Sequence, residues 1–159
     1  MDTTNDARGL GTMKRRQGVS DELDELSSEL VGDALDILAE GDDIGVLLVI
    51  EDENGDVASF EFVDDAPDEL IDAAHDCVVR LARAHGDKES GLGDPIRYAL
   101  VYEGMVGNET GAYQDALLLE FGERGYNAYS AYSFYEGKGA GEDFRWTEPA
   151  PAGEVEPLL

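Results

Sequence analysis

The sequence IGVLLVIEDENGDVASFEFV, residues 44–63, decides the fold of this chain. It holds two apolar runs, residues 44–51 and 57–63, of the composition that strands favour. Asn54 and Gly55 lie between the runs, and Asn-Gly is a strong signal for a two-residue β-hairpin turn. The stretch therefore predicts two antiparallel strands joined by a tight turn.

A two-residue turn also sets which residues of the two strands lie opposite each other. In that register Val49 pairs with Phe60 and Leu47 with Phe62, which gives the sheet one strongly apolar face. The opposite face is expected to be only partly buried, because it combines apolar with polar side chains: Val46, Leu48, Ile50, Ser59 and Glu61.

Amphipathic helices are predicted on either side of the hairpin. Residues 20–41 begin with Ser20, a good N-cap, and carry apolar residues every three or four positions. Residues 65–85 show the same period, with Asp65 as the expected N-cap and Pro67 in the first turn. Each apolar stripe is expected to pack on the sheet.

Three further strands are predicted after the second helix, over residues 96–106, 114–121 and 127–136. The element order is then αββαβββ and the fold class is α+β. We expect a single domain with a mainly antiparallel five-stranded sheet and two helices packed on one face. This acidic α+β domain covers residues 20–137.

Both ends of the chain are expected to be irregular. Residues 1–19 are interpreted as a flexible basic arm, since they carry four basic and two acidic side chains. Residues 138–159 form a tail rich in glycine and proline, which favour irregular structure. Phe144 and Trp146 are the side chains best suited to dock this tail on the domain.

The net charge of −26, from 37 acidic and 11 basic residues, is the strongest feature of the composition. No Lys or Arg occurs between Gln17 and Val79, a stretch with 21 acidic residues. Phosphate repulsion therefore opposes direct nucleic-acid binding by the folded domain. Two interpretations of the charge stay open. It keeps the protein soluble, for instance in a salty cytoplasm, or it attracts a basic protein, including by mimicry of nucleic acid.

The first predicted helix gives part of this charge a definite location. Its acidic residues fall on the side opposite the apolar stripe, with no basic residue nearby in sequence. Residues 14–16 of the basic arm are a rival for this face, because they could fold back onto it. The candidate binding residues for a basic partner are Glu25, Glu29, Asp33 and Asp36.

The sequence offers little for a metal or cofactor. Its single cysteine, Cys77, lies on an apolar stripe, and its two histidines are about 15 Å apart on one predicted helix. No P-loop, dinucleotide fingerprint or HExxH motif occurs. We therefore predict no metal site and no cofactor.

Paired carboxylates are the one enzyme-like feature. Asp115 and Glu120 flank a predicted buried strand, where carboxylates can hold Mg²⁺ for phosphodiester chemistry. The lysine that commonly follows the second carboxylate by two residues in nucleases is replaced by Gly122. Two interpretations follow: a metal-dependent phosphodiesterase or nuclease-like site, or two strand residues without a catalytic role.

Tyrosines recur every three residues in YNAYSAYSFYEG, residues 126–137. On a strand, Tyr129 and Tyr135 face one side, and Tyr132 faces the other beside Phe134. Since both faces are then aromatic, we expect the outer one to be covered by the tail, a ligand or a second copy of the chain. Packing within the chain is the simplest of these.

These patterns together favour a non-enzymatic protein-interaction or accessory module with an acidic surface. Its expected partner is a basic protein, and a homodimer is a further expectation. The phosphodiesterase-like enzyme and an acidic inhibitor that mimics nucleic acid remain as alternatives. We expect a cytoplasmic protein without membrane contact, because there is no signal sequence and the longest apolar run is far below the ~20 residues of a membrane span.

Overall fold

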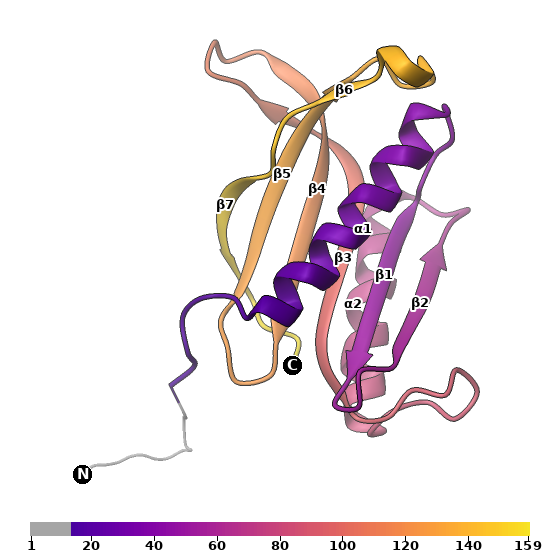
Figure 1. Cartoon of the computed structure of the whole chain (residues 1–159), viewed down its shortest axis with the longest axis vertical. Helices are drawn as coiled ribbons and strands as arrows, with labels where there is room; N and C mark the ends of the chain where they lie inside the picture. The colour runs from indigo at the N-terminus through magenta and orange to yellow at the C-terminus, as the bar shows by residue number, and fades with distance from the viewer. Residues whose placement is uncertain (1–13) are drawn as a thin grey trace.

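The computed structural model describes residues 14–159, so most of the predicted basic arm lies outside the described residues. Two α-helices, α1 and α2, and seven strands are arranged in a twisted sheet with a helix on each side (Figure 1). The helices are α1 (Asp21–Ala39) and α2 (Pro67–Arg83). The strands are β1 (Val46–Asp52), β2 (Val57–Phe62), β3 (Pro95–Gly107), β4 (Tyr113–Glu123), β5 (Ala128–Glu136), β6 (Arg145–Trp146) and β7 (Ala150–Val155).

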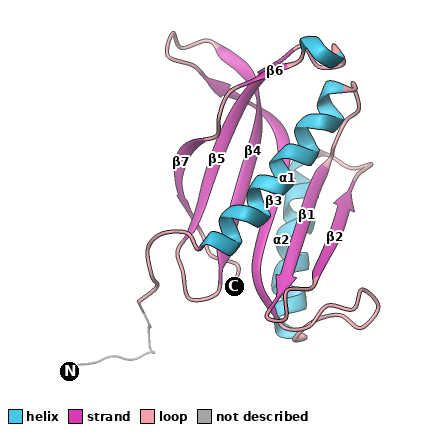
Figure 2. Cartoon of the chain, in the orientation of Figure 1, coloured by secondary structure: helices cyan, strands magenta, loops and turns pink. Residues whose placement is uncertain are grey.

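The α+β class and the antiparallel sheet are confirmed, but the predicted number of strands is wrong. The sheet has seven strands in the order β2-β1-β3-β4-β5-β6, and β7 also pairs with β5 (Figure 2). All of its strand pairs are antiparallel. The prediction missed two strands because both lie in the segment 138–159, where glycine and proline favour irregular structure.

The two extra strands share one edge of β5. β6 pairs with Tyr135 and Glu136, while β7 pairs with residues 128–132. Pro151 lies within β7, where it is tolerated because β7 is an edge strand and proline has no N–H to donate. The C-terminal segment is therefore part of the sheet.

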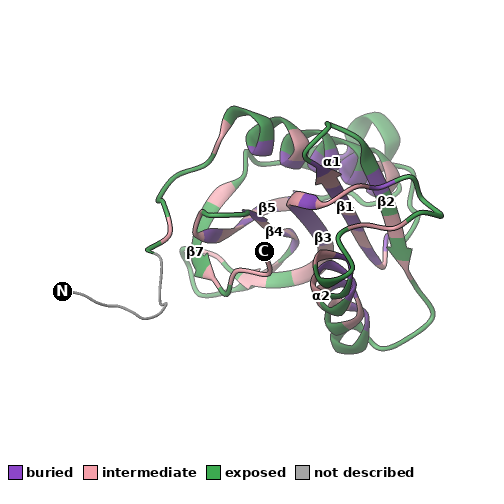
Figure 3. Ribbon diagram, turned by 90° about the horizontal axis from the view of Figure 1, so that it is seen from below, coloured by how far each residue is buried: buried purple, intermediate pink, exposed green. Residues whose placement is uncertain are grey.

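The two helices lie on opposite faces of the sheet, which corrects the prediction that both pack on one face (Figure 3). Leu47 and Val49 of β1 pack in the core on the α1 side. Their neighbours in β1 pack in the core on the α2 side: Val46, Leu48 and Ile50. The physical reason is that β1 is apolar at successive positions, so each of its faces must be covered.

The N–H of Asp52 donates to the carbonyl of Asp56 at 2.9 Å, so the hairpin loop is the three residues 53–55 and the predicted register is wrong by one residue. Leu48 lies opposite Phe60, and Val46 lies opposite Phe62. Gly55 closes the loop with φ of 88°, a left-handed conformation that glycine adopts without strain. A one-residue shift moves Phe60 and Phe62 to the α2 side of the sheet.

Asp52 explains why the longer loop is stable. Its buried carboxylate accepts hydrogen bonds from the backbone N–H groups of Asn54 at 2.8 Å, Asp56 at 2.9 Å and Gly93 at 2.7 Å. Burial alone would raise the pKa of Asp52, but these backbone donors hold it below its usual value. The side chain thus ties the hairpin to the loop that precedes β3.

The start of α1 is fixed by a chain of polar contacts. The predicted N-cap is confirmed, since Ser20 Oγ accepts a hydrogen bond from the N–H of Leu23 at 3.1 Å. Ser20 also donates to Glu123 Oε1 at 2.6 Å. Glu123 in turn pairs with Arg97 at 3.2 Å, and Arg97 pairs with Glu51 at 2.8 Å. One partly buried network therefore joins α1 to β1, β3 and β4.

The N-cap of α2 is not the residue predicted from the sequence. Ala66 occupies the cap position and makes no side-chain cap hydrogen bond, while Pro67 begins the helix. Asp65 therefore does not cap α2.

Within residues 14–159, no helix is long and apolar enough to cross a membrane.

Candidate functional site: a groove beside helix α1

A groove of about 1150 Å³ lies between α1 and the C-terminal segment. We call it the α1–β5 groove. Its floor consists of four residues of β4 and β5, namely Leu119, Phe121, Tyr129 and Ala131. Its walls are the side of α1 that carries Ser28 and Gly32, and the segment 141–154, which includes Phe144, Trp146, Pro149 and Pro151.

The groove exists because the sheet is wider than the helix that covers it. α1 packs mainly against β3 and β4, and it crosses the sheet obliquely (Figure 1). β5 lies beyond α1, and β6 and β7 extend the sheet further on the same side. Phe121 and Tyr129 on the floor are therefore only partly covered, whereas Leu119 and Ala131 are buried.

Aromatic contacts hold the floor and the C-terminal wall in place. Phe121 and Tyr129 have ring centroids 6.1 Å apart on the floor. Phe144 packs between Tyr135 at 5.7 Å and Trp146 at 6.1 Å, and is itself buried. Trp146 keeps 55% of its surface exposed. The groove thus presents one large accessible aromatic side chain on a wall that the core anchors.

The rim of the groove is acidic. Five acidic residues line it, and no Lys, Arg or His is among its lining residues. Within the described part of the chain, none of the five makes an ion pair. They come from α1 and from the C-terminal segment: Asp24, Asp36, Glu142, Glu148 and Glu154.

Residues 137–144 contact the chain around the C-terminal end of α1. The N–H of Gly139 donates to the carbonyl of Leu38 at 3.0 Å. A Cβ at Gly41 would lie only 3.2 Å from Gly139 Cα, so the two backbones need glycine to approach. Lys138 pairs with Asp43, and this pairing raises the pKa of Lys138 and lowers that of Asp43.

Residues 15–18 contact the β4–β5 loop and Tyr129. The N–H of Gly18 donates to the hydroxyl of Tyr129 at 2.8 Å, and Arg15 donates to the carbonyl of Tyr126 at 2.9 Å. The guanidinium of Arg16 lies 5.9 Å from the ring centroid of Tyr126, within reach of a cation–π contact. Arg15 and Arg16 thus bind the β4–β5 loop, and the expected folding back onto the acidic face of α1 is not seen for them.

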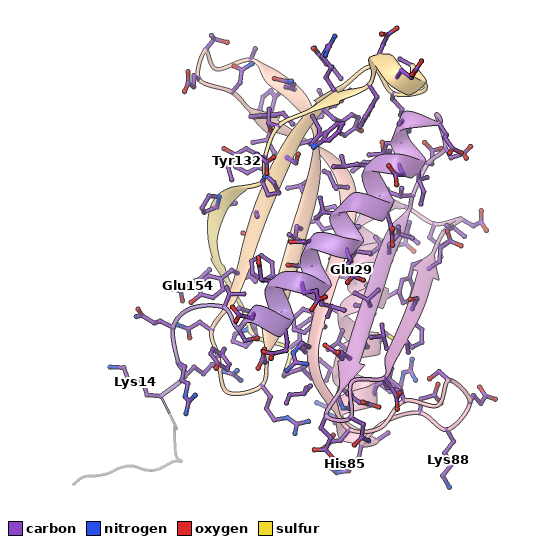
Figure 4. The ribbon with its side chains drawn as sticks, in the orientation of Figure 1. Lys14, Glu29, His85, Lys88, Tyr132 and Glu154 are labelled. Carbon is purple, nitrogen blue, oxygen red and sulfur yellow. The ribbon has the colours of Figure 1, made fainter. Side chains whose placement is uncertain are left out.

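The predicted acidic face divides into two parts. Asp36 lines the α1–β5 groove, whereas Glu25, Glu29 and Asp33 are exposed residues of α1 that do not line it. Figure 4 labels Glu29 on α1 and Glu154 on β7. We call Glu25, Glu29 and Asp33 the outer acidic row.

The predicted aromatic strand alternates as expected. Tyr129 is on the groove floor, and Tyr135 is buried on the same face beneath Phe144. Tyr132 is on the opposite face, where its ring meets that of Phe134 edge-on at 5.1 Å. The C-terminal segment covers Tyr135, so packing within the chain accounts for that residue.

The paired carboxylates are not brought together. Asp115 and Glu120 are five residues apart on β4, which has no bulge, so their side chains point to opposite faces of the sheet. They cannot be ligands of one metal ion, and the shared site that the phosphodiesterase alternative needs does not form. Within residues 14–159, no group of three or more His, Cys, Asp and Glu residues is placed to hold a metal ion.

Glu120 instead belongs to a small cluster with a histidine and a tyrosine. Its Oε1 is 2.9 Å from Nε2 of His75 on α2, and its Oε2 accepts a hydrogen bond from Tyr102 at 3.1 Å. The bond to Glu120 raises the pKa of His75. Burial and the charge of Glu120 raise the pKa of Tyr102 to about 12. Both carboxylate oxygens are engaged, so the cluster serves to hold α2 on the sheet.

Sequence reasoning missed most of the groove. Glu142, Glu148 and Glu154 lie in the segment whose composition predicts irregular structure, and Asp24 is not among the predicted binding residues. Gly32, a glycine in the middle of a helix, is the one local signal that points to this wall.

No protein-family model, curated protein or solved structure matches this chain. The geometry and charge of the groove therefore carry the functional argument.

Proposed function

We propose that this protein is a non-enzymatic interaction module that binds a basic segment of a partner protein in the α1–β5 groove. The observation that carries the proposal is the combination of an apolar floor with a rim of five acidic residues and no basic one. Recognition sites of this kind use the apolar part for affinity and the charges for partner choice.

The apolar part of the groove supplies the affinity in this proposal. Burial of apolar surface contributes about 25 cal/mol per Å², and large aromatic side chains are the usual anchors of an interface. Trp146 fits the role of an anchor, because it is half exposed while its neighbour Phe144 holds it against the core. Phe121 and Tyr129 offer further aromatic surface on the floor.

The acidic residues select the partner. A basic segment can pair with the rim, whereas an acidic segment or a nucleic-acid backbone would be repelled by it. The outer acidic row extends the negative field beyond the groove and would speed the approach of a basic partner. We therefore assign the selection of a basic segment, through its dissociation rate, to the rim and the association rate to the outer acidic row.

The test is a titration of a fluorescent basic amphipathic peptide, made of leucine and lysine, with three forms of the protein. One is unchanged, one carries Asp24→Asn, Asp36→Asn and Glu148→Gln in the rim, and one carries Glu25→Gln, Glu29→Gln and Asp33→Asn in the outer acidic row. The two triple variants change the net charge equally, so each is the control for the other.

We expect the rim variant to lose at least about tenfold in affinity, mainly through faster dissociation. The outer variant should keep its dissociation rate and lose association rate, with a weaker dependence on salt. Equal losses in the two variants would reduce the binding to general charge attraction and overturn the proposal. So would equal affinity of the unchanged protein for an acidic peptide of the same length.

A further inference from the structure

The α1 face of the sheet carries a groove beside α1 that no second α-helix of residues 14–159 fills. α1 packs mainly on β3 and β4, and α2 lies on the other face (Figures 1 and 3), so Tyr129 of β5 stays partly exposed on the groove side, while Tyr135 is buried beneath Phe144. The sheet there carries apolar side chains of the kind that helices usually cover. The groove therefore runs beside α1 where a neighbouring helix would lie.

The wall of the groove formed by α1 has small side chains at its centre. Gly32 and Ser28, one turn apart, both line the groove. Glycine in a helix interior costs about 1 kcal/mol relative to alanine. A Cβ at Gly32 would meet no described atom within 4 Å, so packing within the described chain does not require glycine here. Close approach of an external element is a physical reason to keep it.

The sheet itself leaves little for an extended peptide to bind in the groove. Strand addition requires unpaired backbone N–H and C=O groups at a strand edge. One edge of β5 pairs with β4, and the other pairs with β7 and β6. The outer edge of β7 is free, but this short strand contains Pro151, which has no N–H to donate to an added strand. A helix satisfies its own backbone groups and needs only a surface for its side chains.

We infer that the groove binds an amphipathic helix of the partner protein, packed beside α1 with its closest approach at Gly32. This inference rests on the proposed function. The groove follows α1 from Asp24 to Ala39, about 22 Å at the rise of a helix, which corresponds to a helix of roughly 15 residues. Its apolar stripe lies on the floor beside Trp146, and its basic residues flank that stripe toward Asp24 and Asp36 on one side.

The other rim gives the helix its second row of charges. Glu142, Glu148 and Glu154 stand on the C-terminal wall, opposite α1. A helix whose apolar stripe is bordered by Lys or Arg on both sides matches this arrangement. A helix with basic residues only at its ends does not, because the acids line both long sides of the groove.

The experiment compares two peptides of about 16 residues on the full chain. Both contain the same leucines and lysines, with leucines at positions i, i+3, i+4 and i+7 and alanines at most of the remaining positions. One is held helical by a side-chain staple, and the other carries two proline substitutions at its centre, which break the helix. The protein is tested unchanged, as Gly32→Leu and as Gly107→Leu.

Gly107→Leu is the matched control for Gly32→Leu. Gly107 is exposed in β3, does not line the groove, and has open space around its Cβ position. Both substitutions leave the net charge unchanged, and thermal unfolding verifies that each variant folds. Leucine at Gly32 fills the place where the partner helix comes closest.

We expect the stapled peptide to bind at least about tenfold more tightly than the proline peptide. Gly32→Leu should weaken binding of the stapled peptide at least about tenfold, whereas Gly107→Leu should change it less than about twofold. Equal binding of the two peptides, or full affinity of Gly32→Leu, would overturn the inference that the bound segment is a helix. The proposed function would still be tested separately, by the rim variant. Equal affinity of the stapled peptide for the unchanged protein and for the rim variant would instead overturn the proposed function itself.

Discussion

Replacement of Arg97 by methionine should destabilise this protein strongly. The Arg97 side chain is only 12% exposed, and it pairs with Glu51 at 2.8 Å and with Glu123 at 3.2 Å. Methionine keeps much of the volume but leaves both carboxylates without their cation. Breaking a buried ion pair on one side costs about 3–5 kcal/mol, because the remaining charge stays buried and unpaired.

The structure also predicts how this loss is recovered. The triple variant Arg97→Met, Glu51→Gln and Glu123→Gln removes both negative charges, and the new amide oxygen at position 123 can still accept the hydrogen bond of Ser20. Replacing a buried ion-pair network by neutral groups is often close to neutral in stability. We therefore expect the triple variant to lie within about 1–2 kcal/mol of the unchanged protein.

Urea unfolding at neutral pH and a fixed, high KCl concentration measures these differences. Arg145→Met is the matched control, because Arg145 is exposed and its loss changes the net charge equally. A deficit of Arg97→Met no larger than that of Arg145→Met would refute the reasoning.

Three further predictions follow from charge and from two local contacts. Because the net charge of −26 opposes compaction and salt screens it, the unfolding temperature should rise as KCl is increased from about 0.05 M to about 1 M; a flat or falling curve would contradict this. The bond to Glu120 raises the pKa of His75. The contact between them therefore adds less than about 1 kcal/mol to the free energy of unfolding, and this stabilisation is present below pH ~6.5 and is lost as the pH rises through the raised pKa. Urea midpoints of His75→Gln should lack this decline. Asp52→Ala should cost about 2 kcal/mol by calorimetry, since three backbone donors lose their acceptor, whereas exposed Asp56→Ala should cost far less.

The sequence was informative where a local pattern is sufficient. The cap at Ser20 and the periodic leucines after it predicted α1 closely, because both depend on residues within one or two turns. The alternation of Tyr129, Tyr132 and Tyr135 was likewise predictable, since neighbouring residues of any strand face opposite sides.

The sequence failed where distant contacts decide. The hairpin register depends on Asp52, whose carboxylate is fixed by Gly93 from the loop before β3. β6 and β7 are short and exist only because β5 offers them an edge, so nothing local in residues 145–155 identifies them. The placement of the helices could have been inferred, because a strand apolar at every position, as in residues 46–50, needs cover on both faces.

The groove could not be predicted for the same reason. Its lining comes from three separate parts of the chain, and only folding brings Asp36, Tyr129 and Trp146 around one space. Charge density singled out four acidic residues of α1, of which only Asp36 lines that space. Local composition is therefore a poor guide to where the acids of this protein meet an apolar surface.

The pairing of one strand edge by two late segments has a consequence for biosynthesis. A nascent chain that has folded only as far as β5 presents a row of free backbone donors and acceptors, the usual starting point of aggregation. β6 and β7 follow in the chain and occupy that edge. The segment that forms one wall of the groove thus also covers an edge that would otherwise aggregate. Truncation after Gly137, by a stop codon or by proteolysis, should therefore yield aggregated protein in inclusion bodies, and its binding could not be measured.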